Sequence, residues 1–453
     1  MVLAASALEK PAAGKGRFDI MTTALSFYRG LLRAVVCGLE TFPPKRLERE
    51  EIELRKGHYR PERPIPETGT IWVHGASLGE VITLRPFLRR LEGRFGPDRI
   101  VCTATTLDGY RRILADGLSG HASLLPIDLP EFLNPFFDIV RPCLILISET
   151  ELWPVLLATA AERNIPVIII NARINESTVR LRKLAHPLFS PGLAGIRAVF
   201  AQERIYERRY RAVGIPSETI RVLGPFKFDL ELPDGTPQHI RDAYGIPPGR
   251  VVIVGGSTHD GEEAMLLDAL EPLWPRVNAT LVLAPRHMNR VGDVEKLLQT
   301  RHIDYSRLTA RVSPVGRVLL ADTLGELQKL YMAADLAFVG GSLIPRGGHN
   351  LMEPAAAGVP LVTGPHLENF PSERAALVEG NGIRIVNDTA SFGKTFEEFF
   401  ADRPAFVAMG QRALSVQRRM AGAAERTLEA LDEMGVLPAD KDGTQMGART
   451  HRA

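Results

Sequence analysis

Glu80 stands where a general base could act. It follows the apolar run at 70–74 and ends the segment GASLGE, three residues after Ser77. A carboxylate at the positive start of a helix stays ionised near neutral pH and can accept a proton from an incoming hydroxyl. Ser77 and Glu80 also match an S-x-x-E capping box, which is the commoner role. One residue can be both cap and base, so the segment predicts a candidate catalytic glutamate.

Two further acids, Glu149 and Glu151, directly follow the apolar run at 143–148. Carboxylates just beyond a buried strand indicate a site at the end of that strand, although capping of the next helix explains either residue alone. Downstream, a basic stretch could meet the phosphates of an acidic substrate or form a solvated helix face. It contains Arg173, Arg180, Arg182 and Lys183.

The densest group of chemically suggestive residues is GGHNLMEPAAAGVP at 347–360. Its glycines, after a predicted strand at 336–339, allow the backbone to approach a ligand. Asn350 is expected to begin a helix whose free N–H groups face an anion, and Glu353 can accept hydrogen bonds from a sugar hydroxyl. Arg286, directly after another strand, can bind a base or a phosphate through its planar guanidinium. Together these residues predict a nucleotide site.

Motifs for several other kinds of site are absent from the sequence. There is no HExxH, and the cysteines, Cys37, Cys102 and Cys143, form no C-x-x-C pair. No G-x-G-x-x-G follows the first strand, and the phosphate-loop pattern G-x-x-x-x-G-K-[ST] is missing as well. We therefore expect neither a metal nor a nicotinamide or flavin cofactor. Cationic side chains and helix dipoles would then stabilise a leaving group.

The elements that position these residues alternate between β-rich runs and helical patterns. This alternation is typical of parallel α/β sheets, and 453 residues are too many for one typical domain. We predict two doubly wound, Rossmann-like domains with a cleft between the carboxyl ends of their sheets. The predicted strands lie at 70–74, 99–105, 122–127, 143–148, 166–171 and 198–202, and at 251–257, 280–285, 317–322, 336–341, 360–364 and 383–386.

A segment rich in proline, glycine and aspartate separates the two sets of strands and is the expected linker. The expected division is a disordered lead at 1–20, an amphipathic membrane-associated helix at 21–45, an N-terminal acceptor-binding domain at 46–225, the linker at 226–250, a C-terminal nucleotide-binding domain at 251–437 and a disordered tail at 438–453. A formal net charge of +2 gives no bulk reason to bind nucleic acid.

The helix expected at 21–45 is apolar enough to raise the question of a membrane. Arg29 and Arg33 interrupt it, so no run approaches the roughly 18 uncharged apolar residues of a spanning helix. The apolar positions fall at helical spacing, and the two arginines could meet anionic headgroups, which favours a helix lying on a membrane surface. A helix packed on its own domain is the alternative. The apolar positions are Leu25, Tyr28, Leu32, Val35, Val36 and Leu39.

Eight motifs in a fixed order resemble one known family. They are HGASLGE, SETELWP, NARIN, GPFKFD, GSTHDGEE, APRH, DTLGEL and FVGGSLIPRGGHNLMEP, and the resemblance runs from about residue 20 to about residue 425. This set resembles the 3-deoxy-D-manno-octulosonic acid (Kdo) transferases of Gram-negative lipopolysaccharide assembly. Here the last motif reads Asn-Leu-Met-Glu-Pro where the family often has Asn-Pro-Leu-Glu, which can change backbone preorganisation at the phosphate site.

The resemblance implies a GT-B glycosyltransferase on the cytoplasmic face of the inner membrane. It further implies inverting transfer of Kdo from CMP-Kdo to a lipid A precursor, lipid IVA. In such an enzyme Glu80 would be the general base, and Glu149 and Lys227 would stabilise the transition state. The implied CMP site consists of Pro285, Arg286, Leu324, Gly325, Glu326, Asn350, Leu351, Met352 and Glu353.

Two alternatives stay open at this point. Another envelope glycosyltransferase of GT-B architecture, with a different nucleotide-sugar donor, would share the fold and the helix-start geometry. A non-catalytic, membrane-bound nucleotide sensor would keep the nucleotide site, although Glu80 and Lys227 argue against it. A donor screen separates the first alternative, because CMP but not UDP should bind.

Overall fold

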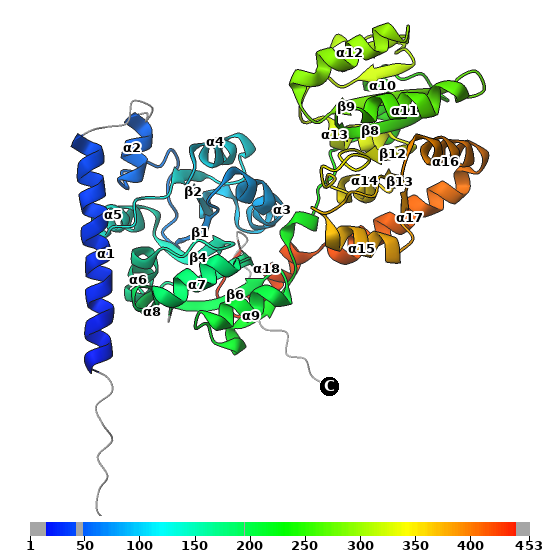
Figure 1. Ribbon diagram of the computed structural model, residues 1–453. Helices are drawn as coiled ribbons and strands as arrows, with labels where there is room; N and C mark the ends of the chain where they lie inside the picture. Colours follow the sequence, from blue (N-terminus) through cyan, green and yellow to red (C-terminus); the bar gives the residue numbers. More distant parts are fainter. Residues whose placement is uncertain (1–14, 42–48, 194, 441–453) are drawn as a thin grey trace, which may run out of the picture. The chain divides into compact units, whose positions relative to one another are not determined.

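A computed structural model describes residues 15–41, 49–193 and 195–440 of the chain (Figure 1). The chain divides into two compact units. Unit 1 runs to Asp229 and resumes at Gly422, and unit 2 comprises Leu230–Ala421. The chain therefore leaves unit 1 once, builds unit 2, and returns to unit 1 near its end.

Unit 1 is built on a seven-stranded sheet in the order β3-β2-β1-β4-β5-β6-β7, and every neighbouring pair is parallel. The strands are β1 (Thr70–His74), β2 (Ile100–Ala104), β3 (His121–Leu124), β4 (Pro142–Ser148), β5 (Val167–Ala172), β6 (Ile196–Ala201) and β7 (Ile220–Val222). The helices are α1 (Lys15–Thr41), α2 (Arg49–Arg55), α3 (Leu78–Phe95), α4 (Leu107–Asp116), α5 (Pro130–Val140), α6 (Pro154–Glu162), α7 (Glu176–Leu184), α8 (His186–Leu193), α9 (Arg204–Ala212) and α18 (Ala423–Glu433), with short 3-10 turns η1 (Pro97–Arg99), η2 (Ser217–Thr219) and η3 (Phe226–Phe228).

Unit 2 repeats this plan with the strand order β10-β11-β9-β8-β12-β13-β14, again all parallel. The strands are β8 (Val251–Thr258), β9 (Ala279–Pro285), β10 (Tyr305–Arg307), β11 (Val318–Leu320), β12 (Leu336–Val339), β13 (Leu361–Thr363) and β14 (Ile383–Ile385). The helices are α10 (Pro237–Ala243), α11 (Glu262–Leu270), α12 (Val291–Thr300), α13 (Leu327–Ala333), α14 (Met352–Ala356), α15 (Pro371–Glu379), α16 (Thr389–Ala401) and α17 (Arg403–Met420), with 3-10 turns η4 (Glu271–Leu273), η5 (Met288–Arg290) and η6 (Leu308–Ala310).

The strands form the core of each unit because helices cover both faces of the sheet. In unit 1, Trp72 and Ile145 pack into one apolar cluster, whereas their neighbours Ile71 and Leu144 pack into a second. Side chains alternate across a strand, so a strand covered on both faces reads as an apolar run without polar alternation. This is why the buried strands were visible in the sequence.

In both sheets the chain reverses its direction of winding beside the first strand. From β1 the chain proceeds outward to β2 and β3, then returns to pair β4 on the other side of β1. Unit 2 does the same at β8, with β9 on one side and β12 on the other. Ligands of doubly wound sheets bind beyond the carboxyl ends of the strands at such a reversal. The two positions to inspect are thus the ends of β1 and β4, and the ends of β8 and β12.

Twelve of the strands correspond to predicted ones, and the described structure adds β7 and β10. Both are three-residue strands at a sheet edge, and most of their residues are at least partly exposed. An edge strand needs no continuous apolar run, so neither had a periodicity signal.

The boundaries between the two units differ from the expected domain boundaries, both where the chain enters unit 2 and where it returns to unit 1. The expected linker at 226–250 is shared, because η3 belongs to unit 1 and α10 to unit 2. The second domain was expected to extend to residue 437, whereas α18 belongs to unit 1. Arg90 and Arg94 of α3 bind Glu425 and Asp432 of α18, which accounts for the difference.

The expected lead and tail fall partly outside the described residues, namely 1–14 and 441–453. Residues 15–20, expected to be disordered, lie within α1. At the other end, Asp440 binds Arg94, and the Ala439 carbonyl accepts a hydrogen bond from Arg99. The first residues of the expected tail are therefore held against unit 1.

Helix α1 combines features of both sequence interpretations. Leu25 is buried and Tyr28 packs against the same apolar cluster of unit 1, as expected of a helix packed on its own domain. A different apolar stripe, Phe27, Leu31 and Val35, stays 74%, 57% and 51% exposed. These three residues are spaced four apart and lie on one helix face.

The arginines of α1 interact with acidic residues of unit 1, while the Arg33 side chain stays 56% exposed. Arg33 forms a two-pronged ion pair with Glu131 of α5, at 2.7 and 3.0 Å. Arg29 is partly buried, and its charge acts on both Glu131 and Asp128. Both cations therefore fasten α1 to unit 1. Among the described residues, no helix is both long and apolar enough to cross a membrane.

Candidate functional site

Glu80 lies in the first turn of α3, directly beyond the carboxyl end of β1. Ser77 caps the helix, and its hydroxyl accepts a hydrogen bond from the Glu80 N–H at 3.4 Å. The Glu80 carboxylate reaches back and accepts hydrogen bonds from the Ala76 N–H at 3.0 Å and the Ser77 hydroxyl at 3.4 Å. The predicted cap is therefore present, and it holds the carboxylate at the strand end.

The protonation state of Glu80 differs from the sequence expectation. Burial raises its pKa to about 7, and the negative charges of Glu149 and Glu151 add to the effect, while the hydrogen bonds from Ala76 and Ser77 oppose it. The helix start was expected to keep Glu80 ionised near neutral pH, but desolvation outweighs that influence. A carboxyl with a pKa near 7 suits a general base better, because it accepts a proton readily and is still partly ionised.

Glu149 occupies the corresponding position at the end of β4, the neighbour of β1. Its backbone is left-handed, with φ of 54°, a strained conformation for a residue with a side chain. The Tyr210 hydroxyl donates to the Glu149 carbonyl at 2.6 Å and fixes this turn. Arg173 binds the carboxylate at 3.1 Å, although burial still raises its pKa overall. The carboxylate is thereby aimed to the same sheet edge as Glu80.

Glu151, considered in the sequence but not selected as a site residue, joins this cluster. Burial raises its pKa most, and the nearby charge of Arg182 opposes the shift. Arg182 itself is only 9% exposed, and its guanidinium donates to the Thr150 carbonyl and lies over the Phe189 ring. The basic stretch is thus divided, since Arg182 supports the acidic loop from inside, whereas Lys183 is exposed.

Lys227 lies in η3, at the last part of unit 1 before the chain crosses to unit 2. The turn is anchored by Phe226, which stacks on Phe87 of α3 and donates its N–H to the Asn171 side chain at 3.1 Å. The Lys227 ammonium lies 4.7 Å from the Phe228 ring centroid. The turn η3, which carries Lys227, therefore packs against α3, the helix that carries Glu80, and both belong to unit 1.

Arg286 follows β9 directly and is exposed, while Pro285 is the buried last residue of that strand. The Arg286 N–H donates to the Thr258 carbonyl at the end of β8, which fixes the loop to the neighbouring strand. The second predicted segment, Leu324–Glu326, lies between β11 and α13. Leu324 is 70% exposed, and Glu326 accepts a hydrogen bond from Tyr244 at 2.5 Å.

The segment Asn350–Glu353 departs from the expected geometry. The helix begins at Met352 rather than Asn350, and α14 is only five residues long. The Asn350 side chain accepts the Met352 N–H at 3.0 Å and donates to the Glu353 carboxylate at 3.1 Å. Leu351 and Met352 are fully buried, so their side chains pack inside unit 2. One of the N–H groups expected to face an anion is therefore already paired.

Sequence reasoning missed the histidines of unit 2. His259, two residues after a backbone with φ of 55° at Ser257, meets His349 with their Nε2 atoms 2.8 Å apart. His287, beside Arg286, packs edge-on against His259. His259 and His287 closely follow predicted strands, so their position at one sheet edge agrees with the strand order. His349 lies at the far end of the loop after β12, and the strand order alone does not place it there.

The buried carboxylate of Glu262 organises this part of unit 2. It is 0% exposed and accepts N–H hydrogen bonds from His259, Gly341, Ser342 and Leu343 at 2.7–3.0 Å. It thereby ties the loop after β8 to the glycine-containing loop after β12. A sequence pattern offers no sign of this role, because Glu262 simply reads as an acid in the first turn of α11.

The predicted site residues thus form two sets, one in each unit. Glu80, Glu149 and Lys227 belong to unit 1, and the predicted CMP residues belong to unit 2. Within the described ranges, no group of three or more His, Cys, Asp or Glu side chains is arranged to hold a metal ion. That the reaction needs no metal or other cofactor stays a prediction.

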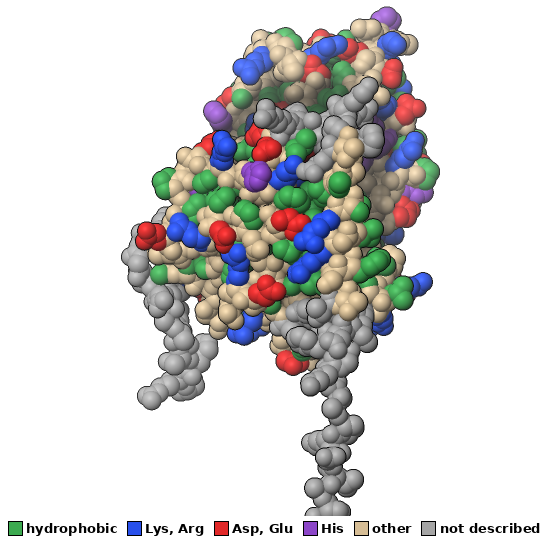
Figure 2. All heavy atoms as spheres, turned by 90° about the vertical axis from the view of Figure 1, so that its left-hand side faces the viewer, with side chains coloured by type: hydrophobic (Ala, Val, Ile, Leu, Met, Phe, Trp, Pro, Cys, Tyr) green, Lys and Arg blue, Asp and Glu red, His purple; other side chains and the backbone are tan. Residues whose placement is uncertain are grey.

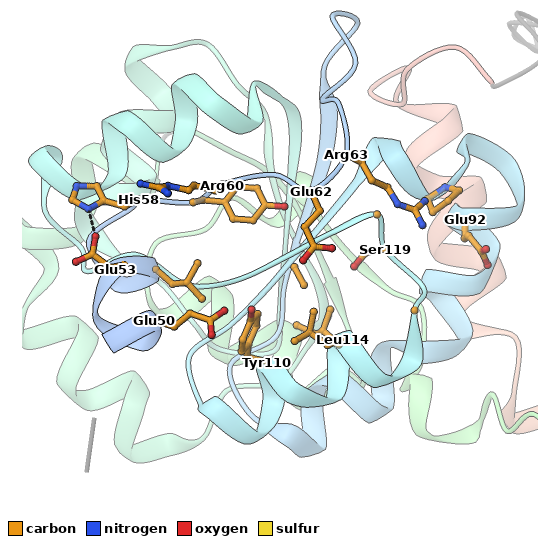
Figure 3. A pocket seen from close by; sticks show the side chains of 17 residues that line it. Glu50, Glu53, His58, Arg60, Glu62, Arg63, Glu92, Tyr110, Leu114 and Ser119 are labelled. Carbon is orange, nitrogen blue, oxygen red and sulfur yellow. Dashed lines mark hydrogen bonds and ion pairs between the residues drawn. The ribbon is translucent and has the colours of Figure 1, made fainter. Parts of the chain in front are cut away.

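A separate pocket of about 880 Å³ opens on unit 1 beside the edge strand β3 (Figure 3). Figure 3 shows Glu62 pointing into its centre and Glu50 beside Tyr110. The pocket reaches Gly120 and Ala122, at the start of β3, and Pro97, just before β2. It therefore lies toward the amino ends of these strands, whereas Glu80 and Glu149 follow carboxyl ends. None of the predicted site residues lines it.

A family model and individual relatives of this chain point to the same protein family. The family model described as 3-deoxy-D-manno-octulosonic-acid transferase (kdotransferase) matches residues 50–230. The 3-deoxy-D-manno-octulosonic acid transferase of Haemophilus influenzae is 34% identical over 390 residues, which cover 84% of this chain and 91% of that protein. The enzyme of the same name from Bordetella pertussis is 33% identical, covering 84% of this chain and 90% of that protein.

A solved structure supports the architecture independently. The UDP-GlcNAc 2-epimerase of Neisseria meningitidis bound to UDP-GlcNAc covers 80% of this chain and 99% of its own, with a TM-score of 0.53 and 16% identity. At this identity the likeness concerns the fold alone. Two parallel seven-stranded sheets with helices on both faces, together with this neighbour, are the GT-B architecture.

Proposed function

Because the chain belongs to the 3-deoxy-D-manno-octulosonic acid (Kdo) transferase family, it is a glycosyltransferase of lipopolysaccharide synthesis, and we propose that it moves Kdo from CMP-Kdo to lipid IVA. The transfer inverts the anomeric configuration, with Glu80 as the general base. The observation that carries this proposal is the Glu80 carboxyl, held at the end of β1 with a pKa of about 7. Family membership also favours a catalytic protein over the nucleotide-sensor alternative.

Glu80 begins the reaction by accepting the proton of an acceptor hydroxyl. Its second oxygen stays hydrogen-bonded to the Ala76 N–H, so the carboxylate keeps its orientation while it takes the proton. The hydroxyl oxygen attacks the anomeric carbon of Kdo from the face opposite the phosphate, which gives inversion. A base positioned in this way typically contributes on the order of 10² to 10⁴ in rate.

Departure of CMP separates charge, and different residues stabilise the two ends. Positive charge develops at the anomeric carbon, and the Glu149 carboxylate, oriented by Arg173, can stabilise it. Negative charge develops on the phosphate of CMP, where Arg286 of unit 2 is exposed after its strand. Lys227, through its ammonium, adds positive charge for the same purpose in this proposal.

The acceptor is a lipid, so the enzyme must work at a membrane surface. The exposed stripe of α1, formed by Phe27, Leu31 and Val35, is suited to enter the headgroup region. Figure 2 shows the face of the molecule on which α1 lies, where hydrophobic side chains are interspersed with basic and acidic ones. We place this contact at the cytoplasmic face of the inner membrane, as expected for the family.

Vesicle sedimentation tests the membrane contact. Replacing Phe27 and Leu31 together by glutamate should shift the protein from the pellet to the supernatant with vesicles that contain anionic phospholipid. Val407→Glu, at an exposed apolar position of unit 2, is the matched control and should sediment as the wild type does. Equal sedimentation of all three proteins would contradict a membrane role for the α1 stripe.

Mass spectrometry of lipid products tests the reaction itself. The purified protein is incubated with tetra-acylated lipid IVA and freshly generated CMP-Kdo, and in parallel with UDP-sugars. We expect a lipid whose mass has increased by one or more Kdo residues, only in the first reaction. A sugar transferred from a UDP donor, with CMP-Kdo unused, would instead establish the alternative of another envelope glycosyltransferase.

A further inference from the structure

Three histidines converge where the sheet of unit 2 reverses its winding. His259 follows β8, His287 follows β9 and His349 follows β12, and these strands are neighbours in the order β9-β8-β12. The carboxyl ends of parallel strands meet at one edge of the sheet, and the reversal lies between β8 and β12. The two histidines that touch are those on either side of it.

The contact between His259 and His349 has room for one proton between the two Nε2 atoms. Their Nε2 atoms are 2.8 Å apart, and the rings lie nearly parallel, with centroids separated by 5.1 Å. In such a contact one Nε2 carries the hydrogen and the other accepts it. A second proton would place two N–H donors against each other, so the pair is neutral in the absence of an anion.

The surroundings of the pair are dominated by positive charge. Burial lowers the pKa of His349 to about 4, with further contributions from His259, Arg286 and His287. Burial also lowers the pKa of His259. The charged and titratable groups that act on the pair are Arg286 and His287 after β9, Arg290 in η5, Arg346 after β12 and Glu263 in α11. Of these, Glu263 is already paired with Arg290 at 2.7 Å.

The pair is held in a close-fitting frame. A Cβ atom on Gly341, whose φ is +66°, would lie 3.1 Å from His349 Cδ2 and 3.4 Å from His259 Cδ2. Glu262 fixes both sides by accepting the N–H groups of His259 and Gly341. The frame fixes the backbone that carries the pair before any ligand arrives, which lowers the ordering cost of binding.

The backbone after β12 offers little positive charge for a phosphate, so side chains would have to bind it. α14 has five residues, so its dipole is small, and the Met352 N–H is already paired with Asn350. Arg286, whose charge acts on His349, is next to the pair. An anion here would reverse the balance of charge that keeps the histidines neutral.

We propose that His259 and His349 form an anion-binding pair for the phosphate of the CMP donor, and that the pair gains a proton when the phosphate binds. The proposal rests on the donor assigned above and adds residues outside the predicted CMP site. On binding, the contact between the two Nε2 atoms opens, and both atoms donate hydrogen bonds to phosphate oxygens. The gained proton also neutralises charge as CMP departs.

Calorimetric titration of CMP into the full-length protein tests this step. Titrations at pH 7.5 in buffers with different ionisation enthalpies measure the protons taken up, and cytidine, which lacks the phosphate, is titrated in parallel. We expect net proton uptake with CMP and none with cytidine. His349→Gln and His259→Gln should each bind CMP about tenfold more weakly, without proton uptake, and bind cytidine as the wild type does.

His239→Gln, at an exposed position in α10, is the matched control and should keep wild-type affinity and proton uptake. Thermal unfolding of each variant shows whether it is folded. If the wild type binds CMP without proton uptake and both variants bind it equally well, the role of the pair is refuted while the donor stands. If the wild type does not bind CMP at all, the donor and the pair are both refuted.

Discussion

Glu80 illustrates how a single carboxyl can serve a reaction at the expense of the fold. Its pKa of about 7 in the folded chain exceeds the ordinary value of 4.5, because burial and the charges of Glu149 and Glu151 disfavour ionisation. A raised pKa means that the folded state binds the proton more tightly than the unfolded state does. The stability from this group is therefore present below about pH 4.5 and is lost as the pH rises through 7.

Glu80→Gln should consequently stabilise the protein at high pH while it lowers activity. At pH 8 the variant avoids ionising a partly buried group and should gain about 1–3 kcal/mol in free energy of unfolding. At pH 5 wild-type Glu80 is already protonated, so most of this difference should vanish. Denaturant titrations at the two pH values measure it. A variant less stable than the wild type at pH 8 would show that the ionised carboxylate is favourable where it lies.

Glu151→Gln tests the electrostatic part of the Glu80 pKa. Removing this negative charge should lower the pKa of Glu80, so that the acid limb of the rate profile moves to lower pH. Initial transfer rates between pH 5 and 9 measure the position of the limb. Glu176→Gln is the control, because Glu176 is exposed and pairs with Arg180 on the same helix. If the acid limb is not shifted in Glu151→Gln, the charge of Glu151 does not influence the pKa of the base.

Among the elements, η3 and α18 show how the chain is fastened where it crosses between units. Asp229 is buried, and its carboxylate accepts hydrogen bonds from the N–H groups of Gly422 and Ala424. Asp229 is the last residue of unit 1 before the chain enters unit 2. It thus holds Gly422 and Ala424, which lie where the chain returns to unit 1. Lys227 is two residues away, so the same anchor fixes the turn that carries a proposed catalytic cation.

Asp229→Ala should release the start of α18. It leaves the buried Ala424 N–H and the partly buried Gly422 N–H without this acceptor, which we expect to cost about 1–3 kcal/mol in free energy of unfolding. Asp229→Asn keeps one acceptor and should lose less. Hydrogen exchange at the Ala424 amide, together with denaturant unfolding, measures both effects. Unchanged exchange at Ala424 in Asp229→Ala would mean that other contacts hold α18, such as those of Arg90 and Arg94.

The sequence predicted the strands that consist of a buried apolar run. It did not predict the features that depend on contacts between residues far apart in the chain. β1 appears with the expected bounds, because a strand covered on both faces must be apolar. The adjacency of Glu80 and Glu149 follows from the strand order, but the raised pKa of Glu80 depends on burial that no motif encodes. The pairing of Arg33 with Glu131, 98 residues away, has no local signal in the sequence.

At the scale of the whole molecule, the predicted catalytic residues and the predicted nucleotide residues lie in different units, so nucleotide binding should stabilise one unit more than the other. Unit 2 carries the predicted nucleotide residues, so CMP at 100 times its Kd should stabilise the folded unit 2 by about 2.7 kcal/mol. We expect the largest slowing of hydrogen exchange after β8, β9 and β12. Mass-resolved exchange with and without CMP measures it, with UDP as the control nucleotide. Protection confined to unit 1 would contradict the assignment of the donor site.

The most direct test of the central claim is the pH dependence of kcat/KM for the lipid acceptor, measured for wild type and Glu80→Gln at saturating CMP-Kdo. If Glu80 is the base, the wild-type profile rises with pH through a midpoint near 7, because only the ionised carboxylate accepts the proton. Glu80→Gln should lose roughly 10² to 10⁴ in rate and the acid limb with it. A variant with near wild-type rates and the same acid limb would contradict the account.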